Sequence, residues 1–301
     1  MDDETFKGMF RTESIFKNQK TLTQSWTPEI GQKLLCRDDV INKLVLIHRP
    51  IIENKGEFSA NTLILGSGGI GKTLTTRYFV SRFRDTALKN DVNIKAEYYD
   101  CLQVRTKSAV LRAISEKLHY NQGHGYADNE IMQQILLEIK RQNMYLFIIL
   151  DEVHNIPSED ILALLNASIS YGEKNSRFSI ICISRPTDWY KVETEKIMSR
   201  IQETIRMEPY KHDQAFEILK YRRNLALRDG ALEDADLDLI ADIVVETKSM
   251  RVGIDIMRSC GLHCDELKLR QITAEMIREA RHDVNPSFRA DIIDNLKPQE
   301  Q

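Results

Sequence analysis

The stretch that decides the fold of this chain is Gly66-Ser67-Gly68-Gly69-Ile70-Gly71-Lys72-Thr73. It matches the pattern GxxxxGK[ST] at every fixed position. An apolar run, Thr62–Leu65, precedes it, and a helical pattern begins at its lysine. Glycines let the backbone curl until several amides point toward one anion, and the helix that follows adds the positive end of its dipole. The sequence therefore predicts a phosphate-binding loop between a strand and a helix.

Individual side chains of this loop have distinct expected roles. Every residue from Gly66 to Thr73, and Leu74 after them, is predicted to line a nucleotide site. The Lys72 ammonium is expected to reach the β- and γ-phosphates of ATP, and the Thr73 hydroxyl is expected to ligate Mg²⁺. The alternative, a chance glycine-rich turn, accounts for neither the strand before the motif nor the helix after it.

A second motif lies at the end of another apolar run. Tyr145–Leu150 has the pattern of a strand buried on both faces, and two adjacent carboxylates, Asp151 and Glu152, follow it. In open α/β sheets, ligands bind at this end of the strands. Asp151 is expected to hold Mg²⁺, and Glu152 to orient and deprotonate the attacking water. The pair favours ATP hydrolysis over binding alone, the alternative being a cap on the next helix. His154, beside them, is interpreted as a polar loop residue.

The hydrophobic pattern divides the chain into four zones: 1–57, 58–208, 209–285 and 286–301. The first has mixed polarity and one helix from Asp38 to Arg49, which Pro50 is expected to end. The second alternates strands and helices, which predicts a parallel sheet with crossover helices. The third is a small helical domain, and the fourth is a polar tail or linker.

The expected fold is α/β, with a parallel five-stranded sheet sandwiched by helices and followed by a small all-α domain. The strands are predicted at Thr62–Leu65, Ile94–Tyr99, Tyr145–Leu150, Phe178–Ser184 and Thr204–Met207. The helices between them are predicted near 72–88, 107–118, 129–142 and 159–171. The helices of the all-α domain are predicted near 212–228, 235–247, 250–263 and 273–283.

Composition limits the class of protein. The chain of 301 residues has a net charge of −3, so bulk charge does not direct it to nucleic acid or to a membrane. Its longest apolar run, Met144–Leu150, is far shorter than the roughly 20 residues of a membrane helix, and no secretory signal is present. Its cysteines are scattered and form no CxxC pair, which is typical of reduced thiols in a cytoplasmic protein. Cys260 and Cys264 are interpreted as packing residues.

Several passages resemble one branch of the AAA+ ATPases, the archaeal initiator proteins related to the large subunit of the origin-recognition complex and to the cell-division-cycle helicase loader. The likeness extends over roughly residues 14–284. The passages that carry it are Ser14–Asn18, Trp26–Pro28, Leu35–Asp39, Leu150–Ile156, Met198–Tyr210 and Ser249–Arg258. The resemblance implies an AAA+ base domain, with the helical domain as its lid.

The resemblance also implies roles for single residues. Arg37 falls at a helix start that packs on the adenine, and Tyr210 and Met250 fall in passages that contact the nucleotide. Arg251 matches the sensor-2 position, which touches the γ-phosphate from the lid. Arg200 matches the arginine finger, which is presented in trans to the ATP of a neighbouring subunit. These roles make self-association part of the expectation.

The chain departs from the family pattern at three positions. Cys36 stands where the family commonly has His, and His154 replaces an acid after the carboxylate pair. Arg185 stands where the family has the sensor-1 Asn. Either Ser184 or Arg185 then supplies the polar contact to the nucleotide, or hydrolysis is slow. A weakened sensor 1 suits an ATP-dependent switch rather than a fast motor.

Two further expectations concern DNA. The family continues into a C-terminal winged-helix domain, and this chain ends near where that domain is expected to begin, as in a truncated or divergent initiator. The family's DNA-contacting insertion is placed at Tyr120–Tyr126, which contains no Lys or Arg and reads equally as a surface loop. Lys107, Arg112 and Lys117 are candidate phosphate contacts, although a solvated face is the commoner meaning of such charges.

Three functions remain open from the sequence. The first is a replication initiator that binds ATP, ADP and Mg²⁺, engages double-stranded origin DNA, recruits a replicative helicase and acts in the cytoplasm at the nucleoid. The second is an AAA+ regulator of a mobile element, such as a transposition or plasmid helper. The third is a nucleotide-dependent scaffold that does not bind DNA. Salt-dependent DNA binding separates the first two from the third, and preference for an origin-like repeat separates the first from the second.

Overall fold

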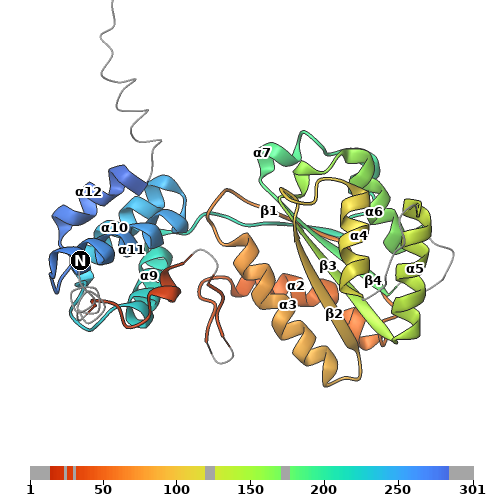
Figure 1. Ribbon diagram of the computed structural model, residues 1–301, viewed down its shortest axis with the longest axis horizontal. Coiled ribbons are helices and arrows are strands. Elements are labelled where there is room, and N and C mark those ends of the chain that lie inside the picture. The colour runs from red at the N-terminus through yellow and green to blue at the C-terminus, as the bar shows by residue number, and fades with distance from the viewer. Residues whose placement is uncertain (1–13, 24–25, 30–31, 119–125, 171–176, 285–301) are drawn as a thin grey trace, which may run out of the picture. The chain divides into compact units, whose positions relative to one another are not determined.

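The computed structural model describes residues 14–23, 26–29, 32–118, 126–170 and 177–284. These residues form two compact units (Figure 1). The first unit takes its described residues from 14–36, Gly68–Gly71 and 209–284, and the second takes them from Arg37–Ser67 and Lys72–Glu208. The predicted zone 1–57 is therefore divided between the two units, at the step from Cys36 to Arg37.

The second unit is built on a parallel five-stranded sheet. Its strands are β1 (Thr62–Leu65), β2 (Asn93–Asp100), β3 (Met144–Asp151), β4 (Phe178–Ser184) and β5 (Glu203–Arg206). Their spatial order is β2-β3-β4-β1-β5, and every neighbouring pair is parallel. The carboxyl ends of all five strands therefore meet at one edge, with β4 between β1 and β3. The predicted α/β class and parallel sheet are confirmed.

Helices cover both faces of this sheet (Figure 1). They are α2 (Asp38–Glu53), α3 (Lys72–Leu88), α4 (Lys107–Lys117), α5 (Asp128–Arg141) and α6 (Ser158–Ser170). On β3, Leu146, Ile148 and Leu150 share one core cluster with side chains of α4, α5 and α6. Phe147 points the other way, where its ring lies 4.9 Å from that of His48 on α2 and 6.0 Å from that of Phe83 on α3. This alternation explains why the strand is apolar throughout.

Three short helices of the second unit were not expected from the sequence. They are η2 (Val153–Asn155), α7 (Pro186–Trp189) and α8 (Glu195–Met198). Each spans about one turn, which is too short for an apolar stripe to repeat. Helix η2 directly follows β3 and α7 directly follows β4, so these two determine where the polar residues after β3 and β4 lie, whereas α8 leads toward β5.

The prediction that Pro50 ends the first helix is wrong. Helix α2 continues through Pro50 to Glu53. A proline inside a helix costs one backbone hydrogen bond and crowds the preceding turn. Here the next residue, Ile51, is completely buried, and the carbonyl of Pro50 accepts a bond from Asn54 N at 2.9 Å. Burial of the last turn therefore offsets the helix-breaking tendency of the proline.

The first unit is a helical domain with its own core. Its helices are η1 (Gln19–Leu22), α9 (His212–Ala226), α10 (Asp234–Thr247), α11 (Met250–Leu267) and α12 (Ala274–Val284). Helix α11 runs four residues past its expected end at 263. Cys260 and Cys264 are buried in the core of this domain, which agrees with their interpretation as packing residues.

The N-terminal segment packs on this helical domain. Asp265 of α11 accepts hydrogen bonds from Ser14 Oγ at 2.6 Å and Ile15 N at 2.7 Å. A Cβ at Gly261 would overlap the ring of Phe16, so glycine is needed for this close approach. The guanidinium of Arg222 lies 3.8 Å from the ring centroid of Trp26, and burial lowers its pKa to about 10. The segment is thus part of the helical domain's fold.

None of the helices in the described ranges combines the length and the apolar character needed to cross a bilayer.

A buried asparagine connects the sheet to its surroundings and yields a stability prediction. Asn61 Oδ1 accepts from Ile180 N at 3.0 Å, and Asn61 Nδ2 donates to the Arg200 carbonyl at 3.2 Å. Asn61→Ala leaves both backbone groups buried without these bonds, so we expect a loss of ~2–3 kcal/mol of unfolding free energy. Urea titration followed by circular dichroism measures it. The control is Asn90→Ala, at an exposed turn position just after α3, and equal midpoints for the two variants would contradict the assignment.

Candidate nucleotide-binding site

The phosphate-binding loop follows β1 and ends in the first turn of α3. Two of its glycines have backbone angles that side chains rarely adopt, with φ of 76° at Gly69 and 90° at Gly71. Lys72 is buried, and its Nζ donates to the carbonyls of Gly66 at 2.8 Å and Ser67 at 2.9 Å. The ammonium is therefore held inside the curl of the loop, where the motif places the phosphates.

The Thr73 hydroxyl and the Asp151 carboxylate are brought together across the sheet edge. Thr73 Oγ1 donates to Asp151 Oδ2 at 2.5 Å, although the two residues are 78 positions apart. The predicted metal ligands thus form one oxygen cluster at the carboxyl ends of β1 and β3. Oxygen donors of this kind suit Mg²⁺.

Tyr98 is a site residue that sequence reasoning missed. Its hydroxyl donates to the same oxygen of Asp151, Oδ2. Burial, followed by the charge of Asp151, raises the pKa of Tyr98 well above its usual value. The guanidinium of Arg77 lies 4.2 Å from the centroid of its ring. The available signal was its position two residues before the end of β2, the strand that pairs with β3.

Glu152 follows β3 with an unusual backbone. It has φ 53° and ψ 42°, the left-handed region, which is costly for a residue other than glycine. Its carbonyl accepts from Asn155 N at 3.0 Å and from Asn155 Nδ2 at 2.8 Å, which holds the turn. The Glu152 side chain reaches toward the end of β4, where its Oε2 lies 3.9 Å from Arg185 Nε.

His154 and Arg185, the two residues after β3 and β4 that depart from the family pattern, both lie close to Glu152. His154 Nδ1 lies 2.9 Å from Ser184 Oγ, and His154 Nε2 lies 3.5 Å from Glu152 Oε2. Arg185 Nε lies 3.9 Å from Glu152 Oε2 and 2.8 Å from Asp188 Oδ2 on α7. Ser184 is completely buried, so its hydroxyl is committed to His154 and the backbone. The interpretation of His154 as a plain loop residue is therefore incomplete.

Two further predicted residues lie in the second unit. Arg37 is buried at the start of α2 and donates from Nη1 to the Glu208 carbonyl at 3.2 Å. Arg200 follows α8, and its Nε is buried without a hydrogen-bond partner in the described part of the chain. The carbonyl of Arg200 is held by Asn61, so the backbone that presents this arginine is fixed.

The remaining predicted residues lie in the first unit, together with the tip of the loop. Met250 and Arg251 form the first turn of α11, and Met250 is buried. A Cβ built on Gly69 would lie 3.3 Å from the Cβ of Arg251 and would overlap the Ser249 hydroxyl. A Cβ on Gly71 would lie 3.3 Å from the hydroxyl of Tyr210. The start of α11 and Tyr210 therefore lie against the loop tip.

The DNA-contact candidates are only partly described. Tyr120–Gly125 of the proposed insertion lies outside the described residues. Lys107, at the start of α4, pairs with Asp128 at 3.2 Å. Its charge is therefore partly used within the protein.

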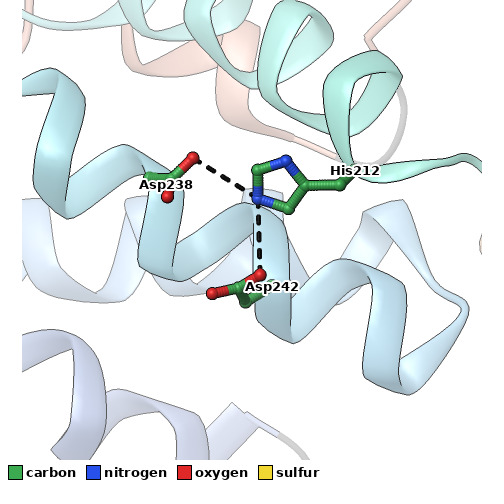
Figure 2. A group of neighbouring side chains, drawn as sticks. All are labelled: His212, Asp238 and Asp242. Atoms are coloured by element: carbon green, nitrogen blue, oxygen red, sulfur yellow. Dashed lines mark ion pairs between the residues drawn. The ribbon is translucent and has the colours of Figure 1, made fainter.

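A separate group of ligand-type side chains lies on the helical domain. Figure 2 shows His212 at the start of α9 pointing between Asp238 and Asp242, one turn apart on α10. His212 Nε2 lies 3.3 Å from each carboxylate. Both aspartates are exposed, and ion pairs of this kind contribute little to stability. The contacts are explained by ion pairing between α9 and α10.

The fold and the site together define a P-loop ATPase of the AAA+ class. The protein-family description "AAA domain" matches residues 59–192, and the description "Cdc6 AAA+ ATPase-type lid domain" matches residues 216–282. The chain therefore carries an AAA domain followed by a Cdc6-type lid domain, which confirms the resemblance found in the sequence.

Individual relatives support this assignment. The ORC1-type DNA replication protein 1 of Archaeoglobus fulgidus is 26% identical over 97% of this chain and 71% of its own length. The Aeropyrum pernix ORC2 protein, solved as ADPNP–ADP complexes, has a TM-score of 0.79 at 22% identity over 90% of this chain and 72% of its own. The Aeropyrum pernix ORC1 protein in complex with DNA has a TM-score of 0.77 at 20% identity over 95% and 74%. These structures share the fold.

The loop lysine provides the first functional test. Lys72→Ala removes the only ammonium within the loop, so we expect nucleotide affinity to fall ~100-fold, the loss of a charge-assisted phosphate contact. Binding of a fluorescent ATP analogue measures it. Lys89→Ala, at an exposed position just after α3, is the matched control. Equal affinities in the two variants would mean that the loop does not bind phosphate as described.

Proposed function

We propose that this chain is an ATP-switched initiator of DNA replication that binds duplex origin DNA and recruits a replicative helicase. One observation carries the proposal: Thr73 and Asp151, separated in sequence, converge next to Lys72 and Glu152 in a chain with a Cdc6-type lid. This arrangement is suited to nucleotide hydrolysis, and the lid type relates it to replication proteins rather than to other ATPases.

Nucleotide binding is assigned to the phosphate-binding loop and to residues that the family resemblance relates to the nucleotide. The amides of Gly66–Thr73 and the Lys72 ammonium hold the phosphates. Leu74, Arg37, Tyr210 and Met250 complete the nucleotide site. The positive φ angles of Gly69 and Gly71 support the assignment, because they leave the loop amides free to face an anion.

Magnesium is assigned to the Thr73 hydroxyl and the Asp151 carboxylate. Their separation of 2.5 Å fits a shared cation site, because both present oxygen atoms to one point. A bound Mg²⁺ would neutralise charge on the phosphate oxygens. Tyr98 orients the Asp151 carboxylate through its hydrogen bond to the same oxygen.

Hydrolysis is assigned to Glu152 as the base. Glu152 accepts a proton from water as the water oxygen bonds to the γ-phosphorus and the bond to the β–γ bridging oxygen breaks. Arg251, from the lid, and Arg200, in trans from a second copy, stabilise the charge that develops on the phosphate. Ser184 is assigned to the nucleotide site as a member of the polar cluster at the end of β4.

The switch is the difference between the ATP and ADP states. The sensor-2 role of Arg251 makes the lid respond to the γ-phosphate, and DNA affinity and helicase recruitment follow that response. The names of the relatives above, which include an ORC1 protein in complex with DNA, support a role at the chromosome and therefore a cytoplasmic, nucleoid-associated protein.

The base is tested by a charge-neutral replacement. Glu152→Gln retains shape but its amide cannot accept a proton, so we expect turnover to fall at least ~100-fold while ATP still binds. Phosphate release and analogue binding are measured on the same preparation. Glu57→Gln, at an exposed position before β1, is the control. Normal turnover in Glu152→Gln would remove Glu152 from the mechanism.

The DNA role is tested by fluorescence anisotropy with labelled duplex, in ATP, in ADP and without nucleotide, across a salt series. We expect binding that depends on the nucleotide and weakens as salt increases, because phosphate contacts release counterions. Preference for a chromosomal origin repeat over transposon-end DNA would support the initiator over a mobile-element regulator. Absence of binding at low salt would favour a scaffold that does not use DNA.

A further inference from the structure

The imidazole of His154 bridges the ends of two strands. It lies in η2, directly after β3, and its side chain is only 12% exposed. Nδ1 is 2.9 Å from Ser184 Oγ at the end of β4, and Nε2 is 3.5 Å from Glu152 Oε2. The second distance is that of an ion pair rather than a short hydrogen bond. One ring therefore joins the carboxylate of Glu152 to a buried hydroxyl on the neighbouring strand.

Ser184 is in turn fixed to the phosphate-binding loop. Its carbonyl accepts from Gly66 N at 3.3 Å, and its hydroxyl lies 2.9 Å from His154 Nδ1 and 3.2 Å from the carbonyl of Arg185. When the hydroxyl donates to Nδ1, the nearer of the two, the neutral ring carries its proton on Nε2, which faces the Glu152 carboxylate. A continuous path of contacts thus runs from Gly66 through Ser184 and His154 to Glu152.

Arg185 also approaches Glu152, but it is the weaker restraint. Its Nε is 3.9 Å from Glu152 Oε2, and its side chain is 49% exposed, so solvent screens the pair. It is closer to Asp188, at 2.8 Å. A hydrogen bond from Lys191 lowers the pKa of Asp188, so this carboxylate is an anion that engages Arg185. The ring of His154, which is less exposed and lies closer to Glu152, therefore has the larger effect on the position of Glu152.

We propose that His154 is a positioning residue for ATP hydrolysis, which holds the Glu152 carboxylate in register with the phosphate-binding loop through Ser184. The proposal rests on the function assigned above, in which Glu152 accepts the proton of water. Asn155 holds the backbone of Glu152 and His154 holds its side chain, so the left-handed turn and the imidazole act on the same residue. Ser184, the polar side chain at the end of β4, then acts on Glu152 through the imidazole of His154.

The test uses the full chain, four single variants of the cluster, one double variant and one control variant. His154→Ala removes both contacts. His154→Asn places an amide nitrogen near the position of Nδ1, and His154→Gln places one near Nε2. Ser184→Ala removes the hydroxyl alone. His263→Ala, on α11 of the helical domain and 47% exposed at its side chain, is the matched control. For each variant, kcat, KM for ATP, affinity for a fluorescent ATP analogue and Tm are measured.

Positioning predicts a particular pattern. His154→Ala should lower kcat ~10-fold, with analogue affinity and Tm close to those of the unmodified chain, because a misplaced base slows only the chemical step. His154→Gln should recover more kcat than His154→Asn, since it restores the contact to Glu152. The double variant His154→Ala/Ser184→Ala should be no slower than His154→Ala, because the two residues act as a unit.

Other patterns overturn the proposal. It is wrong if kcat is unchanged in His154→Ala, if kcat falls only in proportion to Tm, or if Asn rescues as well as Gln. Glu152→Gln, assayed in parallel, separates this failure from failure of the proposed function. If Glu152→Gln still hydrolyses ATP, Glu152 is not the base and the proposed function fails. If Glu152→Gln is inactive while His154→Ala is fully active, only the positioning role of His154 fails.

Discussion

The hydrogen bond between Thr73 Oγ1 and Asp151 Oδ2 is the contact on which the rest of the site depends. It ties the first turn of α3 to the end of β3 across the intervening strand β4. The backbone bond from Gly66 to Ser184 ties the same loop to β4 itself. Three strand ends are therefore fixed relative to one another, and a carboxylate placed after β3 has a defined position beside the loop. Parallel order makes this possible, because it brings all the carboxyl ends to one edge.

The polar cluster after β3 and β4 explains how the chain accommodates its departures from the family pattern. An imidazole and a guanidinium replace an acid and an amide, and they lie on either side of Glu152 and Asp188. Arg185 engages Asp188 at 2.8 Å, so the guanidinium that replaces the amide has its own carboxylate partner within the protein.

The helical domain is more than four helices. The N-terminal segment completes its core, with Ser14 and Ile15 on Asp265, Phe16 over Gly261 and Trp26 against Arg222. The first residues of the described chain therefore stabilise helices more than 200 positions away. Met250 and Arg251 belong to this same packed unit, so the position of the first turn of α11 depends on the N-terminal segment as well.

Much of this protein follows from its sequence alone. The glycine spacing of 66–73, the apolar strand before Asp151 and the helical stripes of 209–285 depend on local periodicity and backbone preference, and the structure has them within a few residues of their predicted bounds. Lys72, Thr73, Asp151 and Glu152 were identified because their motifs are short and continuous. Pro50 was misjudged because the burial of Ile51 is not a local property.

Only the tertiary structure brought together residues that are distant in sequence. Tyr98 reaches Asp151 because β2 pairs with β3, and His154 reaches Ser184 because β4 lies beside β3. No spacing rule predicts either contact, since strand order is decided by how the whole sheet packs. The sequence determined which chemical groups the site contains. The order of the strands decided which of them touch.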